Sequence, residues 1–260
     1  MQELRVLLNE AKKHENNNLP LYEALCRSSS VLLASHLEGF VKDITKSVRN
    51  DLNYNLKEFK NMPAALKREF AKKISTYDGV PQPDLDKRAR QIIAFFDDNH
   101  VPIDFDAFTV KEIDGKNPSL KNIEQPFSKF GVGDVLSAVD SAYFLQVFEG
   151  SPGKTHVLLR EMKRCRSTLH AWPYKSIDEK RFSNPITISV KKKKQQSLWV
   201  TFVEEIVTRR HKIAHGESLL NLASSQELDV EVNKVEILMN GLLYYFCGTI
   251  CKQYRTENKF

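Results

Sequence analysis

One short stretch of the chain gathers cationic side chains that could act on a phosphate group. Arg209, Arg210, His211, Lys212 and His215 fall within seven residues. An imidazole can take a proton from a ribose 2′-oxygen or deliver one to a leaving 5′-oxygen. A guanidinium can hold a phosphate by two hydrogen bonds and stabilise the charge that develops on phosphorus. These residue types therefore point to phosphate chemistry that needs no metal ion.

A helix expected over residues 197–215 must position these side chains. Apolar residues recur along it at helical spacing, and Gly216 favours a helix end close to His215. His211 and His215 are four residues apart and share a face, and the helix dipole favours a positively charged imidazole at this end. Arg210 and His215 are five residues apart, roughly 140° around an ideal helix. They converge only if the last turn is relaxed.

Two other interpretations of these residues stay open. Two histidines four apart can ligate zinc, but zinc proteases with this pattern have Glu directly after the first His, where this chain has Lys212. The adjacent arginines would also repel a dication. Alternatively, Arg and His at a helix end cap carbonyls and pair with nearby carboxylates such as Glu204, Glu205 and Glu217. We expect no metal ion and no other cofactor at this stretch.

Composition and spacing predict an all-α fold. The 260 residues include only 10 Gly and 10 Pro, too few turn-forming residues for an all-β sandwich. We expect one helical bundle spanning residues 1–260, with one or two short β excursions near 101–113 and 185–191. Helical spacing predicts helical stretches over residues 2–15, 21–50, 55–76, 84–98, 119–130, 134–149, 154–170, 197–215 and 226–255. Within 55–76, Pro63 is either a first-turn residue or a break.

Charge and hydropathy narrow the choice of partners. Lys and Arg number 39 against 33 Asp and Glu, a formal net charge of +6 that is compatible with a nucleic-acid partner. The longest apolar runs fall far short of the roughly 18 residues that span a bilayer. The first residues become charged too soon for a signal peptide, and the four cysteines form no C-x-x-C pair. We therefore expect a cytoplasmic protein with no membrane partner.

Two segments resemble a known superfamily. Residues 210–215, Arg-His-Lys-Ile-Ala-His, resemble the motif of the HEPN superfamily (higher eukaryotes and prokaryotes nucleotide-binding domains): Arg, a polar residue, three residues and His. Residues 25–42 lead through an apolar run to His-Leu-Glu-Gly-Phe at 36–40. This segment resembles the long early helix of the MAE-like HEPN subgroup. The two segments anchor a resemblance over roughly residues 20–255.

The resemblance implies a dimerising α-helical bundle that, in many members, is a metal-independent endoribonuclease of toxin–antitoxin pairs or phage defence. It makes Arg210 the motif arginine, His215 the motif histidine and His211 the polar residue between them. Glu38 matches an acidic residue that would orient Arg210, or it is simply a solvated or capping carboxylate. The implied partners are RNA, a second copy of the chain, and an antitoxin or defence-system protein.

The function that we expect is cleavage of single-stranded RNA by 2′-hydroxyl attack at a site shared by two chains. Acid–base cleavage uses two proton-transfer groups, and two-fold symmetry would bring a second His215 into one cleft. Arg209 and Lys212 would bind the substrate phosphates. Lys191–Lys194 would do the same or form a solvated loop. The alternative is a catalytically silent HEPN-type module that binds RNA or nucleotides, or dimerises, and acts through a partner protein.

Overall fold

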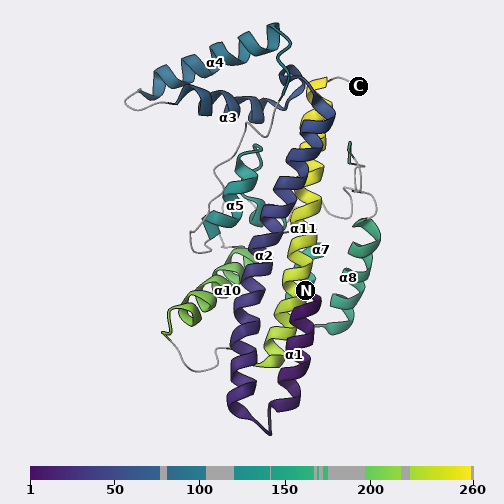
Figure 1. The fold of residues 1–260 in the computed structure, drawn as a ribbon. Helices are drawn as coiled ribbons and strands as arrows, with labels where there is room; N and C mark the ends of the chain where they lie inside the picture. The colour runs from purple at the N-terminus through teal and green to yellow at the C-terminus, as the bar shows by residue number, and fades with distance from the viewer. Residues whose placement is uncertain are drawn as a thin grey trace, which may run out of the picture.

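Two long helices form the axis of the molecule in the computed structural model (Figure 1). The structure describes residues 1–76, 81–103, 120–140, 142–166, 169, 172–174, 197–217 and 223–258. Helix α2, Leu19–Leu56, and helix α11, Ser225–Asn258, lie side by side. At 1.5 Å per residue they extend about 57 and 51 Å. The other helices pack around this pair.

Helix α2 has sequence reasons for its start, its buried face and its end. The side chain of Asn18 accepts a hydrogen bond from the backbone N–H of Leu21, and Pro20 lies in the first turn. The helix stops at Lys57, whose φ is 57°. The helix expected over 21–50 is confirmed and is longer at both ends. Its buried residues recur every three or four positions: Leu33, Leu37, Val41, Ile44, Val48, Leu52 and Leu56.

Helix α1, Gln2–His14, covers one side of the axis. It packs against both α2 and α11, with Leu4 and Leu8 fully buried. Arg5 pairs with Glu236 of α11 at 2.8 Å. The apolar stripe and this ion pair together fix α1 against the long helices.

Helices α3, Ala64–Ser75, and α4, Gln82–Asp98, form a pair at one end of the axis (Figure 1). A short 3₁₀ turn, η1, Phe59–Asn61, precedes them. The rings of Phe59, Phe70 and Phe96 meet with centroids 5.1–6.0 Å apart and hold η1 to the pair. The helical stretch expected over 55–76 is broken at Pro63, one of the two roles that the sequence allows this proline. Proline at 63 has no backbone N–H to continue a helix and directly precedes α3.

The middle of the chain is made of shorter helices. They are α5, Leu120–Ser128; α6, Val135–Ala138; α7, Ala142–Leu145; η2, Gln146–Glu149; α8, Pro152–Arg166; and α10, Leu198–Ala214. The helical stretch expected over 134–149 is divided into three pieces. Both Val139 and Phe144 pack against Gly241 of α11. These two residues are five apart, roughly 140° around a helix, so one unbroken helix could not place both there.

The all-α class is confirmed for the described residues, which contain no sheet. Of the two expected β excursions, residues 104–113 and 185–191 lie outside the described residues. Within 101–103, one isolated antiparallel bridge joins Glu58 to Pro102. The expectation of a single domain over residues 1–260 stays a prediction.

Candidate nucleic-acid site

Helix α10 carries the cationic motif at its C-terminal end. The helix begins at Ser197, whose hydroxyl accepts a hydrogen bond from the N–H of Trp199 at 3.2 Å. Trp199, Phe202 and Val203 are buried, and the helix packs against α2, α5 and α6. Its far end, where the motif lies, projects away from the long helices (Figure 1). The helix expected over 197–215 is confirmed, with its buried part early and its cationic part late.

The end of α10 is a Schellman motif. Gly216 has a φ of +67° and donates its N–H to the carbonyl of Ile213 at 3.2 Å, while Glu217 donates to the carbonyl of Lys212 at 3.0 Å. His215 itself has left the helical conformation, with φ −94° and ψ 2°. The relaxed last turn that the sequence required is therefore present. Only glycine adopts the positive φ at 216 without strain.

Two imidazoles meet at this end. The ring centroids of His211 and His215 lie 4.2 Å apart with their planes inclined by 52°. Both side chains are exposed. The spacing of four residues brings the rings into contact because the backbone stays helical up to Ala214. Two imidazoles, a group type that can transfer protons, thus stand next to each other on one surface of the chain.

Arg209 is tied to the neighbouring long helix. Its two terminal nitrogens donate to the two carboxylate oxygens of Glu231 on α11, at 2.6 and 2.7 Å. The two side chains are only 15% and 13% exposed. The hydrogen bonds to Glu231 raise the pKa of Arg209 above its ordinary value, against the opposing effect of burial. This fork anchors the cationic end of α10 to α11, and the phosphate-binding role expected for Arg209 stays a prediction.

The other two cations of the motif segment, Arg210 and Lys212, differ in exposure. Arg210 is half-buried and Lys212 is exposed. Each helical residue is turned by about 100° from the one before it, so Arg210 faces a different direction from Arg209. Lys212 shares the exposed end with the two imidazoles. The phosphate roles of Arg210 and Lys212 stay predictions that these positions allow.

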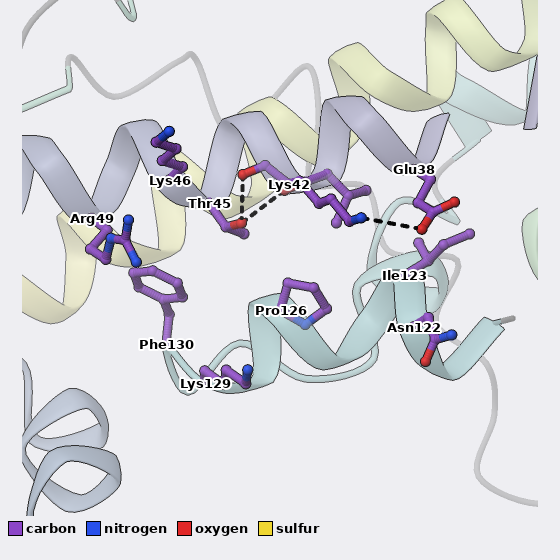
Figure 2. A pocket seen from close by; sticks show the side chains of 11 residues that line it. Glu38, Lys42, Thr45, Lys46, Arg49, Asn122, Ile123, Pro126, Lys129 and Phe130 are labelled. Atoms are coloured by element: carbon purple, nitrogen blue, oxygen red, sulfur yellow. Dashed lines mark hydrogen bonds and ion pairs between the residues drawn. The ribbon is translucent and has the colours of Figure 1, made fainter. Parts of the chain in front are cut away.

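Glu38 lies on α2, on the edge of a groove between α2 and α5 (Figure 2). Its carboxylate is 3.5 Å from Nζ of Lys42, one turn further along the helix. The side chain of Glu38 is 23% exposed. The ion pair shows that it already has a local partner, and its expected role in orienting Arg210 stays a prediction.

Several other expectations concern metal ions, membranes and the lysine run. Residues 191–194 lie outside the described residues. Among the residues that the structure does describe, no three His, Cys, Asp or Glu side chains gather in a way that could hold a metal ion. In the same part of the chain no helix is both long and apolar enough to cross a bilayer.

Sequence reasoning missed one set of functional candidates, the cations around the groove beside Glu38. Lys42, Lys46 and Arg49 follow one another at intervals of four and three along α2, which is a visible signal of a basic helix face. The opposite wall, with Lys129, comes from a segment eighty residues away. Only the fold brings the two walls together.

The chain matches one known protein family. Residues 1–136 match the protein family described as RiboL-PSP-HEPN. The match covers more than half of the chain, and the chain belongs to this family and thereby to the HEPN superfamily. HEPN domains bind RNA and often dimerise, so membership connects the chain with nucleotide- or RNA-related functions. The more specific likeness to the MAE-like subgroup stays a prediction.

The comparisons with individual proteins give no relative. Neither the curated proteins nor the solved structures provide a match to this chain.

Proposed function

We propose that the protein is a metal-independent endoribonuclease that cleaves single-stranded RNA. The observation that carries this proposal is the exposed, relaxed end of α10, where His215 is accessible to a second copy of the chain and its ring lies 4.2 Å from that of His211. Arg210 belongs to the same last turns of the helix. An acid, a base and a guanidinium are the groups that RNA transesterification uses.

The proposed reaction starts at the ribose 2′-hydroxyl. One imidazole removes its proton, the 2′-oxygen attacks the adjacent phosphorus, and Arg210 holds the phosphate oxygens as negative charge builds on them. A second imidazole gives a proton to the departing 5′-oxygen. The products are a 2′,3′-cyclic phosphate and a 5′-hydroxyl, so no water is consumed in this step. The second imidazole comes from a second copy of the chain, whose His215 shares the cleft.

Recognition in this proposal depends on phosphate charge and not on base identity. Lys212 stands on the same exposed surface as the imidazoles and adds to the positive field there. A flexible single strand can align its 2′-oxygen with the scissile phosphorus, which a duplex resists. In the cell such an enzyme would act in the cytoplasm as a toxin or in phage defence, with an antitoxin or activator as its partner protein.

The test is cleavage of a labelled single-stranded RNA in the presence of EDTA. Arg210→Ala and His215→Ala are each expected to lower kcat by about 10²-fold or more, because each removes a group that acts in the transition state. Arg68→Ala and His156→Ala remove exposed side chains of the same types from α3 and α8 and serve as controls that retain activity. Circular dichroism should give the same helical content for all four variants. Equal cleavage by the motif variants and the controls would refute the assignment.

One observation favours a second function. The family match ends at residue 136, before the motif at 210–215. Family membership thus rests on residues outside the motif, which agrees with a module that binds RNA or dimerises and acts through a partner protein. A wild-type protein that binds RNA in the same assay but leaves it intact would establish this alternative.

A further inference from the structure

A second group of cations gathers on α2 and α5, outside the motif on α10. The surface is hollowed into a groove between α2 on one side and α5 with its following turn on the other (Figure 2). None of the described residues that line it belongs to α10. The hollow opens to solvent at its mouth, so it is an open groove and not a closed cavity. We call it the α2–α5 groove.

Both walls of the α2–α5 groove carry cations, three on the α2 side and one on the α5 side. Lys42, Lys46 and Arg49 stand on one face of α2, at intervals of four and three residues, and Lys129 stands on the opposite wall. Among the described lining residues the only carboxylate is that of Glu38, which pairs with Lys42 at 3.5 Å. Four cations and one carboxylate leave a formal charge of +3 around one hollow. Such a surplus is suited to a ligand with more than one negative oxygen.

One of these cations has a buried donor without an acceptor, and another is partly desolvated. The Nε atom of Arg49 is buried and has no acceptor among the residues that the structure describes. A buried donor without an acceptor is unfavourable, and most such groups in proteins are satisfied. Burial also lowers the pKa of Lys129; Glu69 opposes this shift and Lys73 adds to it. An anion in the groove would give Arg49 an acceptor and would add a second negative charge, beside that of Glu69, near Lys129.

The bottom of the groove is apolar. Val41, Ile123 and Phe130 line it and are at most 5% exposed. The ring of Pro126 projects from α5 toward α2 (Figure 2). The hydroxyl of Thr45 points its proton at backbone carbonyls of α2, at 2.9 and 3.1 Å, so it offers no donor to a ligand. The groove thus combines cationic donors at its rim with a floor that fits carbon atoms.

From this combination we propose that the α2–α5 groove binds a phosphate ester. Lys46, Arg49 and Lys129 hold the phosphate oxygens, and the organic part of the ligand lies against the apolar floor. The ester is either a small free molecule or a phosphate within an RNA strand. The proposed phosphate ligands, Lys46, Arg49 and Lys129, include neither a residue of the motif on α10 nor Glu38, so the proposal does not rest on the proposed nuclease activity.

The test is binding measured at constant ionic strength on the full chain. Adenosine 5′-monophosphate is titrated while the Nε–Hε resonance of Arg49 is followed by ¹H–¹⁵N NMR; Arg49→Lys identifies this resonance by removing it. The nucleotide should shift the resonance, and adenosine, which lacks the phosphate, should not. The double variant Lys46→Gln/Lys129→Gln should bind about tenfold or more weakly, because it removes two charge-assisted contacts. Glutamine keeps part of each aliphatic stem, and an otherwise unchanged spectrum shows that the fold is retained.

The control variant, Lys72→Gln/Lys121→Gln, changes the net charge equally at exposed positions outside the groove and should change affinity less than twofold. A 2′-O-methyl octaribonucleotide, which cannot be cleaved by 2′-hydroxyl attack, distinguishes the two sources of phosphate. Displacement of the mononucleotide by the octamer assigns the groove to RNA, and failure to displace it assigns the groove to a small ester. His215→Ala should bind normally in every case, so loss of cleavage leaves this result untouched. An unmoved Arg49 resonance, or equal weakening in the control variant, would overturn the proposal.

Discussion

Arg209 and Arg210 are neighbours in the sequence with different surroundings in the fold. The guanidinium of Arg209 donates hydrogen bonds to both carboxylate oxygens of Glu231, and its side chain is mostly buried. Arg210 follows one step around the helix and is half-buried. Within the proposed mechanism we therefore give Arg209 the task of holding α10 to α11 and Arg210 the task of holding the phosphate. A pair of adjacent arginines is a sequence pattern that does not by itself separate these roles.

The Arg209–Glu231 pair makes a prediction about stability. The Glu231→Gln variant removes the counter-charge that hydrogen-bonds to Arg209, while the guanidinium stays partly buried. We expect the free energy of unfolding to fall by about 2–4 kcal/mol, somewhat below the usual cost of breaking a fully buried ion pair. Urea denaturation followed by circular dichroism measures the change. Glu15→Gln, at an exposed position just after α1, is the matched control and should cost about 0.5 kcal/mol or less. Similar losses in the two variants would show that the pair does not anchor α10.

At the scale of elements, helix α11 holds two glycines with opposite surroundings. A Cβ added at Gly241 would lie 2.4 Å from Cγ1 of Val139 and 3.3 Å from a ring carbon of Phe144. A Cβ added at Gly248 would have no atom outside its own helix within 4 Å. Gly241 therefore permits a close approach of the segment around α6 and α7, while Gly248 only adds flexibility to the unfolded chain.

These surroundings predict opposite effects for the same substitution. Gly241→Ala should lower the free energy of unfolding by about 1–3 kcal/mol, because the added methyl group overpacks the contact. Gly248→Ala should raise it by about 0.5–1 kcal/mol, because alanine is the better helix former. Thermal unfolding of both variants beside the wild type provides the comparison. A stabilised Gly241→Ala variant would mean that α6 and α7 do not pack against α11 as the structure has them.

The sequence predicted some elements well for physical reasons that are local. The motif helix is an example, since an apolar stripe and a C-terminal glycine define it without help from the rest of the chain. The stretch 134–149 is the contrary example: it has helical spacing, yet it is divided because Val139 and Phe144 both pack against Gly241, about a hundred residues later. The α2–α5 groove was not predicted because it, too, depends on contacts between segments that are distant in the sequence. Its two walls are far apart in sequence.

At the scale of the whole molecule, the exposed end of α10 bears on assembly. The end projects from the bundle and presents two imidazoles on one surface (Figure 1). The proposed site draws one proton-transfer group from each of two chains, so the active species would be a homodimer. HEPN domains often dimerise, which agrees with this arrangement.

The proposed dimer predicts that activity depends on protein concentration. Sedimentation should show a homodimer at micromolar concentration, and specific cleavage activity should fall as dilution moves the protein toward monomers. Activity and sedimentation measured over the same dilution series should follow one dissociation curve. A monomer with full nuclease activity would eliminate the shared site and would leave His211 and His215 of one chain as the acid and base.

The central claim is that the ribose 2′-hydroxyl is the nucleophile, and one substrate substitution tests it directly. After a cleavage position has been mapped, the 2′-hydroxyl on the 5′ side of that phosphate is replaced by hydrogen, and labelled product is followed with EDTA present. We predict that cutting at this position stops while positions elsewhere in the strand are still cut, because only the attacking oxygen has been removed. Cutting that continued at the deoxy position would mean that water attacks the phosphorus, and the mechanism assigned to Arg210 and His215 would be wrong.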